Sequence, residues 1–168
     1  GVDIDGCGSY MMHKHDQPVY HKSLQDIKEI IDITALPVII KGIMTSDDAL
    51  KAIEAGASAI VVSNHGGRVL DGTPGTADVL PEIVKSVDGN IPVFVDGGIR
   101  TGYDVLKMLG LGADAVLIGR DLVRAAIGGG ALGVKIHMEY LAQTLKKAMI
   151  MTNCRDLASI SNTIITQK

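Results

Sequence analysis

Apolar runs of strand length alternate with helical segments along the chain, and this alternation restricts the possible folds more than any other feature of the sequence. The expected strands are 1–5, 37–42, 58–64, 91–98 and 113–120. The expected helices are 22–34, 46–56, 76–87, 101–112 and about 131–151. Short connections between such segments are typical of successive right-handed βα units over a parallel sheet. The sequence therefore predicts an α/β fold.

A weak internal repeat favours a particular α/β architecture. The segments EAGASAI and GLGADAV both join the end of a helix to the start of a strand. Repetition of one such unit fits a (β/α) barrel better than a doubly wound sheet. Five units are too few to close an eight-stranded barrel. With 168 residues and 46% apolar composition, the chain is expected to form one domain over residues 1–168, as part of a single barrel.

Chemically reactive side chains follow every expected strand. In a barrel the carboxyl ends of all strands converge on one rim, where active sites are built. Taken singly, a charged residue at a strand end is more often a cap or a solvated charge, and a glycine pair often only permits a turn. Their occurrence at five successive strand ends favours a shared site. The residues are Asp3, Lys41, Ser63 to Arg68, Asp96 to Arg100, and Gly119 with Arg120.

Two neighbouring glycine-arginine loops predict a phosphate site. DGGIRTG places Gly97 and Gly98 before a helix whose first amides are expected to be unpaired, and IGRD repeats the arrangement at the next strand. Such amides, with Arg100 and Arg120, suit a dianionic phosphate. Barrels often bind phosphate after strands seven and eight, so the chain is expected to begin at strand four. It would then be the C-terminal half, strands 4–8, of a (β/α)8 TIM barrel.

Charge and cysteine content restrict the partners. The net charge is −3, and no block of Lys or Arg indicates nucleic acid or an anionic membrane as a partner. No apolar stretch approaches the roughly twenty residues of a membrane span. Cys7 and Cys154 are too few to suggest a disulfide framework, and buried or incidental thiols are the better interpretation. We therefore expect a cytoplasmic protein that binds small molecules or other proteins.

Several motifs carry a resemblance to a known family. The segments SNHGGR, DGGIR and IGR, within a match from about residue 37 to 165, resemble the FMN-dependent L-2-hydroxy acid oxidising family. That family includes glycolate oxidase, lactate oxidase, lactate-oxidising flavocytochromes and mandelate dehydrogenase. Other barrels with similar phosphate loops lack the His-Gly-Gly-x-Arg cluster. The resemblance implies FMN as cofactor and oxidation of a small L-2-hydroxy acid, of lactate or glycolate type, to the 2-keto acid.

The resemblance also implies residue roles. His65 would take the substrate's hydroxyl proton, or its α-proton, and Asp3 would stabilise the imidazolium that forms. Arg68 would hold the substrate carboxylate, and Lys41 would face flavin N1 and O2. Ser63 would contact the isoalloxazine edge. The remaining cofactor contacts would be Asp96 with the ribityl chain, and Gly97, Gly98, Arg100, Gly119 and Arg120 at the phosphate loops. The alternative for His65 is a loop histidine bonded to backbone, and for Arg68 a surface ion pair with Asp71.

The chain departs from the family in three places. Strands one to three, with their flavin contacts and a substrate-binding tyrosine, are absent. The segment after the first strand is short, and His13, Lys14, His15 and Tyr20 are weak candidates for the substrate contacts made there. The spacing of His13, His15 and His21 matches no common metal site, so no metal is expected. Asp121 replaces the family's proline after IGR and is expected to cap the last helix.

Two classes of function remain open. In the first, the chain belongs to a flavoenzyme whose activity requires the full barrel, with the missing N-terminal half as a partner. In the second, it is a non-catalytic half-barrel that assembles or binds a phosphate-bearing ligand. The closing helix and tail resemble a family segment that packs against neighbouring subunits, so a homo-oligomer is expected. The particular hydroxy acid and the electron acceptor stay open.

Overall fold

The computed structural model describes residues 1–8, 14 and 20–166 of the chain. The chain divides into two compact units, Gly1–Gly97 and Gly98–Lys168. The expectation of one domain over residues 1–168 stays a prediction. The expectations for His13 and His15 lie outside the described residues. Cys154 is a free, buried thiol, as its sequence context indicated.

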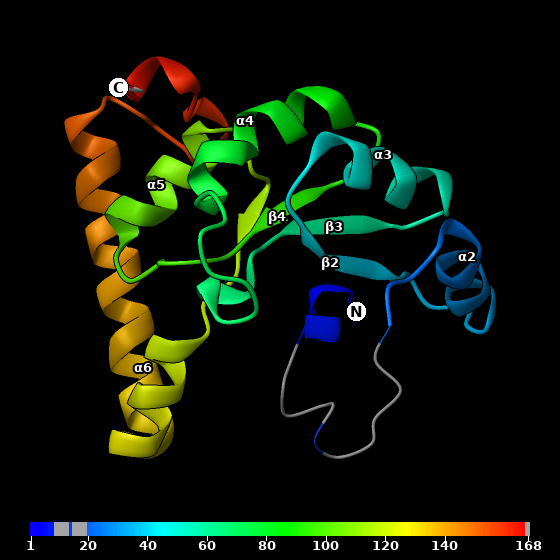
Figure 1. Cartoon of the computed structure of the whole chain (residues 1–168). Coiled ribbons are helices and arrows are strands. Elements are labelled where there is room, and N and C mark those ends of the chain that lie inside the picture. Colours follow the sequence, from blue (N-terminus) through cyan, green and yellow to red (C-terminus); the bar gives the residue numbers. More distant parts are fainter. Residues whose placement is uncertain (9–13, 15–19, 167–168) are drawn as a thin grey trace. The chain divides into compact units, whose positions relative to one another are not determined.

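The first unit contains a parallel sheet and the helices that connect its strands (Figure 1). The strands are β1 (Val2–Asp3), β2 (Ile39–Ile43), β3 (Ala59–Val62) and β4 (Val93–Val95). The α-helices are α2 (Leu24–Asp32), α3 (Ser46–Glu54) and α4 (Thr76–Val87), and two 3-10 turns are η1 (Asp5–Gly8) and η2 (His65–Gly67). Each of β1, β2 and β3 pairs in parallel with the strand that follows it in the chain.

The strand order in this unit is β1-β2-β3-β4, which is the order of the sequence. A doubly wound sheet would reverse direction at a switch point. Sequential order is the arrangement that a barrel requires, because each βα unit adds its strand beside the last one. The prediction of an α/β fold with parallel strands is therefore confirmed.

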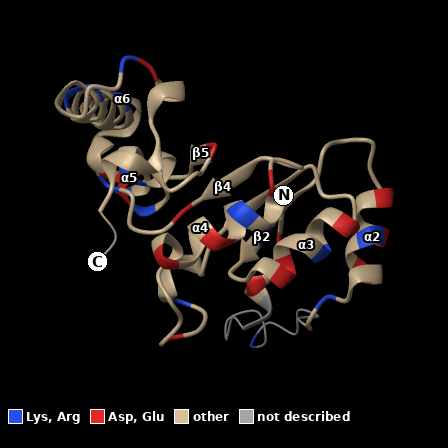
Figure 2. Cartoon of the chain, turned by 90° about the horizontal axis from the view of Figure 1, so that it is seen from above, with Lys and Arg blue, Asp and Glu red and all other residues tan. Residues whose placement is uncertain are grey.

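The core of the first unit lies between the sheet and its helices. All four residues of β3 are buried, as expected for a parallel strand. Leu80, Ile83 and Val87 form the buried face of α4, which packs beside α3. Figure 2 shows Lys and Arg interspersed with Asp and Glu on the helices of this unit. On α3, Lys51 Nζ forms an ion pair with Asp47 Oδ2 at 2.6 Å. Burial of one helix face and solvation of the other fixes how these helices lie on the sheet.

The first strand is shorter than the sequence indicated. A strand over 1–5 was expected, but β1 ends at Asp3 and the chain enters η1 at Asp5. Ile4 makes the last contact to the sheet, donating its N–H to the Lys41 carbonyl at 2.8 Å. The sequence DGCG explains the early end, because glycine favours turns over extended strand. The turn brings Asp5 back beside the end of β2.

The second unit contains α5 (Gly102–Gly110), the short strand β5 (Ala115–Val116) and α6 (Arg120–Met151), followed by η3 (Leu157–Ser159) and η4 (Asn162–Ile164). The last helix was expected from about 131. The structure has helix from Arg120, with a break at Gly130 where φ is 55° and ψ is −145°. The expected helix is the segment after this break. The part before it was missed because the glycine run at 128–130 has low helix propensity.

Helices α5 and α6 pack closely against each other. A Cβ at Gly102 would collide with the backbone of Leu141 and Leu145 on α6, so the absence of a side chain sets the approach of the two helices. The cluster beside this contact contains Leu106, Ala148, Cys154 and Ile160. Among the described residues, no helix is both long enough and apolar enough to cross a membrane.

Candidate active site

The loop after β3 holds His65 in an unusual backbone conformation. Three successive residues, His65, Gly66 and Gly67, have φ values of 56°, 67° and 72°. Glycine adopts this left-handed region without steric cost, whereas a residue with a Cβ does so at roughly 1–2 kcal/mol. The conformation is held by Asn64, whose Oδ1 accepts the Gly67 N–H at 3.1 Å and whose Nδ2 donates to the Pro74 carbonyl at 3.2 Å.

Ser63 holds the backbone of His65 by a hydrogen bond. Its side chain is fully buried at the end of β3, and its Oγ accepts the His65 N–H at 3.1 Å. The sequence predicted that Ser63 contacts the flavin ring. Its observed partner is the His65 backbone, and the flavin contact stays a prediction.

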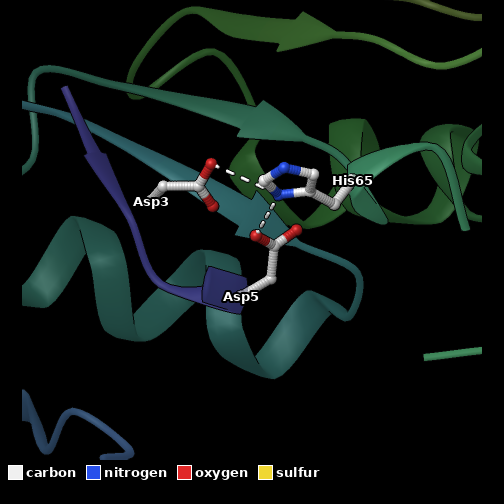
Figure 3. A group of neighbouring side chains, drawn as sticks. All are labelled: Asp3, Asp5 and His65. Atoms are coloured by element: carbon white, nitrogen blue, oxygen red, sulfur yellow. Dashed lines mark hydrogen bonds and ion pairs between the residues drawn. The ribbon is translucent and has the colours of Figure 1, made fainter. Parts of the chain in front are cut away.

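Two carboxylates converge on the His65 imidazole (Figure 3). Asp5 Oδ1 lies 2.8 Å from Nδ1, within hydrogen-bond distance. Asp3 Oδ2 lies 3.5 Å from the same nitrogen. The imidazole is partly buried, with 28% of its side chain exposed. The proximity of Asp3 to His65 agrees with the role predicted for Asp3, but the shorter contact belongs to Asp5.

The protonation equilibria of the two carboxyls are displaced in opposite directions. Burial acts to raise the pKa of Asp3, but hydrogen bonds with Asp5 and Lys41 outweigh it and leave the pKa below its ordinary value. Burial raises the pKa of Asp5, and the hydrogen bond with Asp3 raises it further. Opposite shifts of this kind arise where two carboxyls share one site. Asp3 is therefore the more acidic member of the pair.

Lys41 neutralises part of this negative charge. Its Nζ donates to Asp3 Oδ2 at 2.8 Å and lies 4.0 Å from Asp96 Oδ2. Asp3, Asp5 and His65 place their potential ligand atoms within 4.8 Å of one another, a spacing that a metal ion would also fit. Lys41 already supplies a cation to this group, and we propose no metal there.

Asp96 follows β4, and one of its carboxylate oxygens lacks a hydrogen-bond partner among the described residues. Its Oδ1 is buried and has no hydrogen-bond partner in the described part of the chain. An unpaired buried acceptor is costly unless a donor completes it, and a sugar or ribityl hydroxyl is such a donor. Gly97 is needed beside it, because a Cβ there would lie 3.0 Å from the Thr76 Oγ1 that donates to the Asp96 carbonyl.

Arg68 ends η2 and is exposed to solvent. Its Nε donates to the His65 carbonyl at 3.1 Å, which ties the guanidinium to the histidine loop. Among the described residues Arg68 has no ion pair with Asp71, so the surface ion pair considered as an alternative is not formed. The two terminal nitrogens of the guanidinium remain for a bidentate contact with a carboxylate.

The first amides of α5 are not available to an anion, and the sequence expectation that they are unpaired is wrong. The Asp104 carboxylate accepts the N–H groups of Arg100 at 3.2 Å and Thr101 at 2.9 Å, and Thr144 Oγ1 accepts that of Gly102 at 2.8 Å. The physical reason is a capping box between Thr101 and Asp104.

The start of α6 is not closed in this way. Its N-cap is Gly119, which has no side chain, and among the described residues no side chain caps the helix. The predicted cap, Asp121, lies within the first turn and instead accepts from Arg124 at 2.9 Å.

Arg100 Nε lies 4.0 Å from Asp121 Oδ2, so the loop before α5 and the start of α6 are neighbours within the second unit. Arg100 and Arg120 are both exposed there. A phosphate would therefore meet the α6 amides and two arginines, with Asp121 competing for Arg100.

The loop between Asp96 and Arg100 offers open space next to these groups. Gly98 has a φ of 71°, and a Cβ built there or at Gly119 would meet no atom within 4 Å. The phosphate site expected from the glycine-arginine loops stays a prediction.

Sequence reasoning missed Asp5. The only sequence signal was a second aspartate two residues after Asp3, in a segment that was expected to be strand. In a strand both side chains would share one face, whereas the observed turn brings Asp5 to the same ring nitrogen, Nδ1, that Asp3 approaches (Figure 3).

Comparison with known proteins agrees with this geometry. The chain matches the family model for FMN-dependent dehydrogenases over residues 7–167. The chain belongs to the FMN-dependent dehydrogenase family. It is 43% identical over 163 residues to 2-hydroxyacid oxidase 1 of Homo sapiens, which covers 97% of this chain and 43% of that protein. It is 44% identical over 160 residues to glycolate oxidase 3 of Arabidopsis thaliana, covering 95% of this chain and 43% of that protein.

Solved structures of family members have the same fold. A mandelate oxidase variant with (S)-mandelic acid superposes with a TM-score of 0.81 at 43% identity, covering 86% of this chain and 43% of that one. A mandelate oxidase variant with a monooxide FMN adduct gives a TM-score of 0.81 at 42% identity, covering 86% of this chain and 46% of that one. The chain thus spans less than half the length of the curated relatives it matches. The resemblance predicted from the sequence motifs is confirmed, and FMN is the cofactor of the family.

Proposed function

We propose that this chain carries catalytic residues of an FMN-dependent enzyme that oxidises a small L-2-hydroxy acid to the 2-keto acid. In that enzyme the chain is the C-terminal half, strands 4–8, of a (β/α)8 barrel. The observation that carries the proposal is His65, whose Nδ1 lies 2.8 Å from a carboxylate in a chain of the FMN-dependent dehydrogenase family.

The proposed base is Nε2 of His65. When Nδ1 carries the proton and donates a hydrogen bond to a carboxylate, Nε2 is unprotonated. Its lone pair can then accept a proton from the substrate. That proton comes from the substrate hydroxyl, or from its α-carbon in the carbanion version of the reaction. The carboxylates of Asp3 and Asp5 then balance the charge of the imidazolium, because both lie within 3.5 Å of Nδ1. The negative charge around His65 thus favours the step.

Arg68 is proposed to orient the substrate. Its Nε is engaged by the His65 carbonyl at 3.1 Å, so the guanidinium and the base belong to one rigid loop. A bidentate contact between the terminal nitrogens and the substrate carboxylate would fix the reacting carbon relative to His65. This pairing explains why both residues occur in a single short motif.

FMN, when bound, supplies the acceptor for the hydride equivalent that leaves the substrate. Lys41 is the proposed cation for the negative charge that collects at N1 and O2 of the ring on reduction. Asp96 Oδ1 is the proposed acceptor for a ribityl hydroxyl. In the second unit, the α6 amides with Gly98, Arg100, Gly119 and Arg120 are the proposed phosphate ligands. The unpartnered Asp96 oxygen and the uncapped start of α6 support this assignment.

The proposed substrate class comes from the relatives. The similar proteins are named for 2-hydroxy acid, glycolate and mandelate oxidation, which share an α-hydroxy carboxylate. An N-terminal half of the barrel is the proposed partner, because the chain covers 43% of the length of those proteins. We further propose that the enzyme is a homo-oligomer.

The test is anaerobic reduction of the bound flavin in the protein assembled with its N-terminal half. Absorbance of oxidised FMN should disappear on addition of glycolate, lactate or mandelate, and 2-keto acid should form in equal amount. Flavin that binds but is reduced by none of these acids would favour the second candidate, a non-catalytic module for a phosphate-bearing ligand. Failure to bind any flavin would contradict the proposal.

A further inference from the structure

The two carboxylates beside His65 have different partners. Asp3 accepts from Lys41 at 2.8 Å, whereas Asp5 lies 2.8 Å from the imidazole Nδ1. The distance from Asp3 to the same nitrogen, 3.5 Å, exceeds the usual N–H···O range of 2.7–3.2 Å. In Figure 3 the two carboxylates approach the ring from different elements, β1 and η1. Asp5 is thus within hydrogen-bond distance of the imidazole, whereas Asp3 is near it but too far away for a hydrogen bond.

The backbone of β2 next to Asp5 leaves space for Asp5 to reach His65. Gly42 has a φ of 102°, and a Cβ there would lie 2.9 Å from the Asp5 nitrogen and 3.0 Å from its Cβ. The register between β2 and β3 shifts between Lys41 and Ile43, which is where Gly42 lies. A bulge with glycine therefore makes room for η1 to pack against the end of β2. Asp5 is well buried there, with 15% of its side chain exposed.

We propose that Asp5 is the positioning residue of His65: its carboxylate accepts the Nδ1 proton, fixes the ring orientation and leaves Nε2 unprotonated. Asp3 is then the partner of Lys41, and acts on His65 through its charge. The catalytic consequence of this assignment rests on the proposed function. The assignment of the hydrogen bond itself does not, because it concerns the resting state of the chain's own residues.

Several charged groups face His65. These groups are Asp3 on β1, Asp5 on η1, Lys41 on β2 and Arg68 at the end of η2, and Asp96 after β4 adds its charge through Lys41. Removal of either aspartate takes away negative charge that would stabilise an imidazolium. Loss of the hydrogen bond adds a second effect that charge alone does not give, a change in which ring nitrogen carries the proton.

The experiment is nitrogen-15 NMR of the histidine rings in the folded protein, with the His65 signal assigned by its absence in His65→Gln. Asp5→Asn, Asp3→Asn and the control Asp88→Asn are compared with the unmodified protein. Asp88 is exposed at the end of α4, before β4 begins and so at the opposite end of the strands from His65. Its φ of 49° suits asparagine as well as aspartate.

Asp5→Asn should lower the fraction of His65 that carries its proton on Nδ1, because a neutral amide oxygen accepts the hydrogen bond more weakly than a carboxylate. Asp3→Asn should keep the Nδ1 tautomer, and so should Asp88→Asn. A tautomer change in Asp3→Asn but not in Asp5→Asn would overturn the proposal, and so would an Asp5→Asn protein that matches the control. If Asp5→Asn does not fold, Asp5→Ala removes the same group with less volume and gives the same readout.

A parallel measurement separates this inference from the proposed function. In the FMN-loaded enzyme, kcat should fall in Asp5→Asn, because a smaller fraction of His65 presents an unprotonated Nε2 to the substrate. The ring measurement needs neither flavin nor substrate. An enzyme without hydroxy acid activity would therefore contradict the proposed function while leaving the NMR result to decide the role of Asp5.

Discussion

The conformation of His65 is held by several neighbouring residues at once. Its left-handed φ of 56° is unfavourable for a side chain with a Cβ, on the order of 1 kcal/mol. Ser63 holds its N–H, Arg68 holds its carbonyl and Asp5 holds its ring. Three contacts from three sides keep the residue in one conformation. Strain of this kind is typical of functional loops, where the position of the side chain matters more than local stability.

At this scale we predict that His65→Gln abolishes substrate oxidation without loss of flavin. Glutamine keeps polar atoms near Asp5 but cannot accept a proton at neutral pH, so the rate of flavin reduction should fall by roughly 100- to 10,000-fold. Stopped-flow absorbance under anaerobic conditions measures that rate, and fluorescence titration measures FMN affinity. Flavin reduction at a near-normal rate would rule out His65 as the base.

At the scale of the elements, the packing of α5 against α6 depends on Gly102, which has no side chain. Gly102 lies at the first position of α5, and its missing Cβ lets the helix approach the backbone of Leu141 and Leu145. The same glycine donates its N–H to Thr144 Oγ1 at 2.8 Å. Backbone cannot move aside as a flexible side chain can. The contact between the helices therefore has no room for even one methyl group.

We predict that Gly102→Ala lowers the free energy of unfolding by about 1–3 kcal/mol, because the two helices must separate. The matched control is Gly128→Ala on α6, where a Cβ would meet no atom within 4 Å. Alanine has the higher helix propensity by about 1 kcal/mol, so the control should be neutral or stabilising. Urea unfolding at one fixed protein concentration compares the two. Equal stability of Gly102→Ala and the unmodified protein would contradict the packing argument.

The start of α6 gives a prediction about the cofactor. Arg100→Ala should weaken FMN binding much more than riboflavin binding, because only FMN carries the phosphate that the guanidinium would contact. Arg155→Ala, at an exposed site beyond the end of α6, is the control and should affect neither flavin. Fluorescence titration with both flavins gives the two affinities. If FMN and riboflavin weaken equally in Arg100→Ala, the phosphate does not bind at this loop.

At the scale of the whole molecule, the long helix α6 of the second unit carries several exposed hydrophobic side chains. Exposed hydrophobic residues follow one another along α6, among them Ile127 at 84% exposure and Leu132 at 64%. Soluble monomers rarely expose apolar residues in such a continuous series. The chain also spans 43% of the length of its curated relatives. Both observations are consistent with the proposal of a partner for this chain.

We predict that the 168-residue chain purified alone is not a stable monomer. It should dimerise, bind the proposed N-terminal half or aggregate, because apolar surface and sheet edges gain by being covered. Sedimentation velocity over a range of concentrations measures the state, and addition of the N-terminal half tests whether it replaces self-association. A monomer that unfolds cooperatively would show that the half-barrel interpretation is wrong.

The sequence by itself determined the order and type of the elements. Alternating apolar periodicity predicted five strands and the helices between them, and the strands follow one another in chain order, because burial of one face is encoded every second or every 3.6 residues. It also predicted that Asp3, Lys41 and His65 would meet, since parallel strands share the edge at which they end. The family motifs at residues 63–68 and 96–100 were recognisable for the same reason: they are local in the chain.

Only the tertiary structure decided which groups are paired. Asp5 contacts His65 across 60 positions of sequence because a turn at DGCG and a bulge at Gly42 bring it there, and neither feature has a periodic signal. The amides of α5 are closed by Asp104 and Thr144, whereas among the described residues no side chain caps α6, although both helices follow a glycine loop. Hydrogen bonds form between atoms brought within about 3 Å, and that distance depends on the fold rather than on the spacing of residues along the chain.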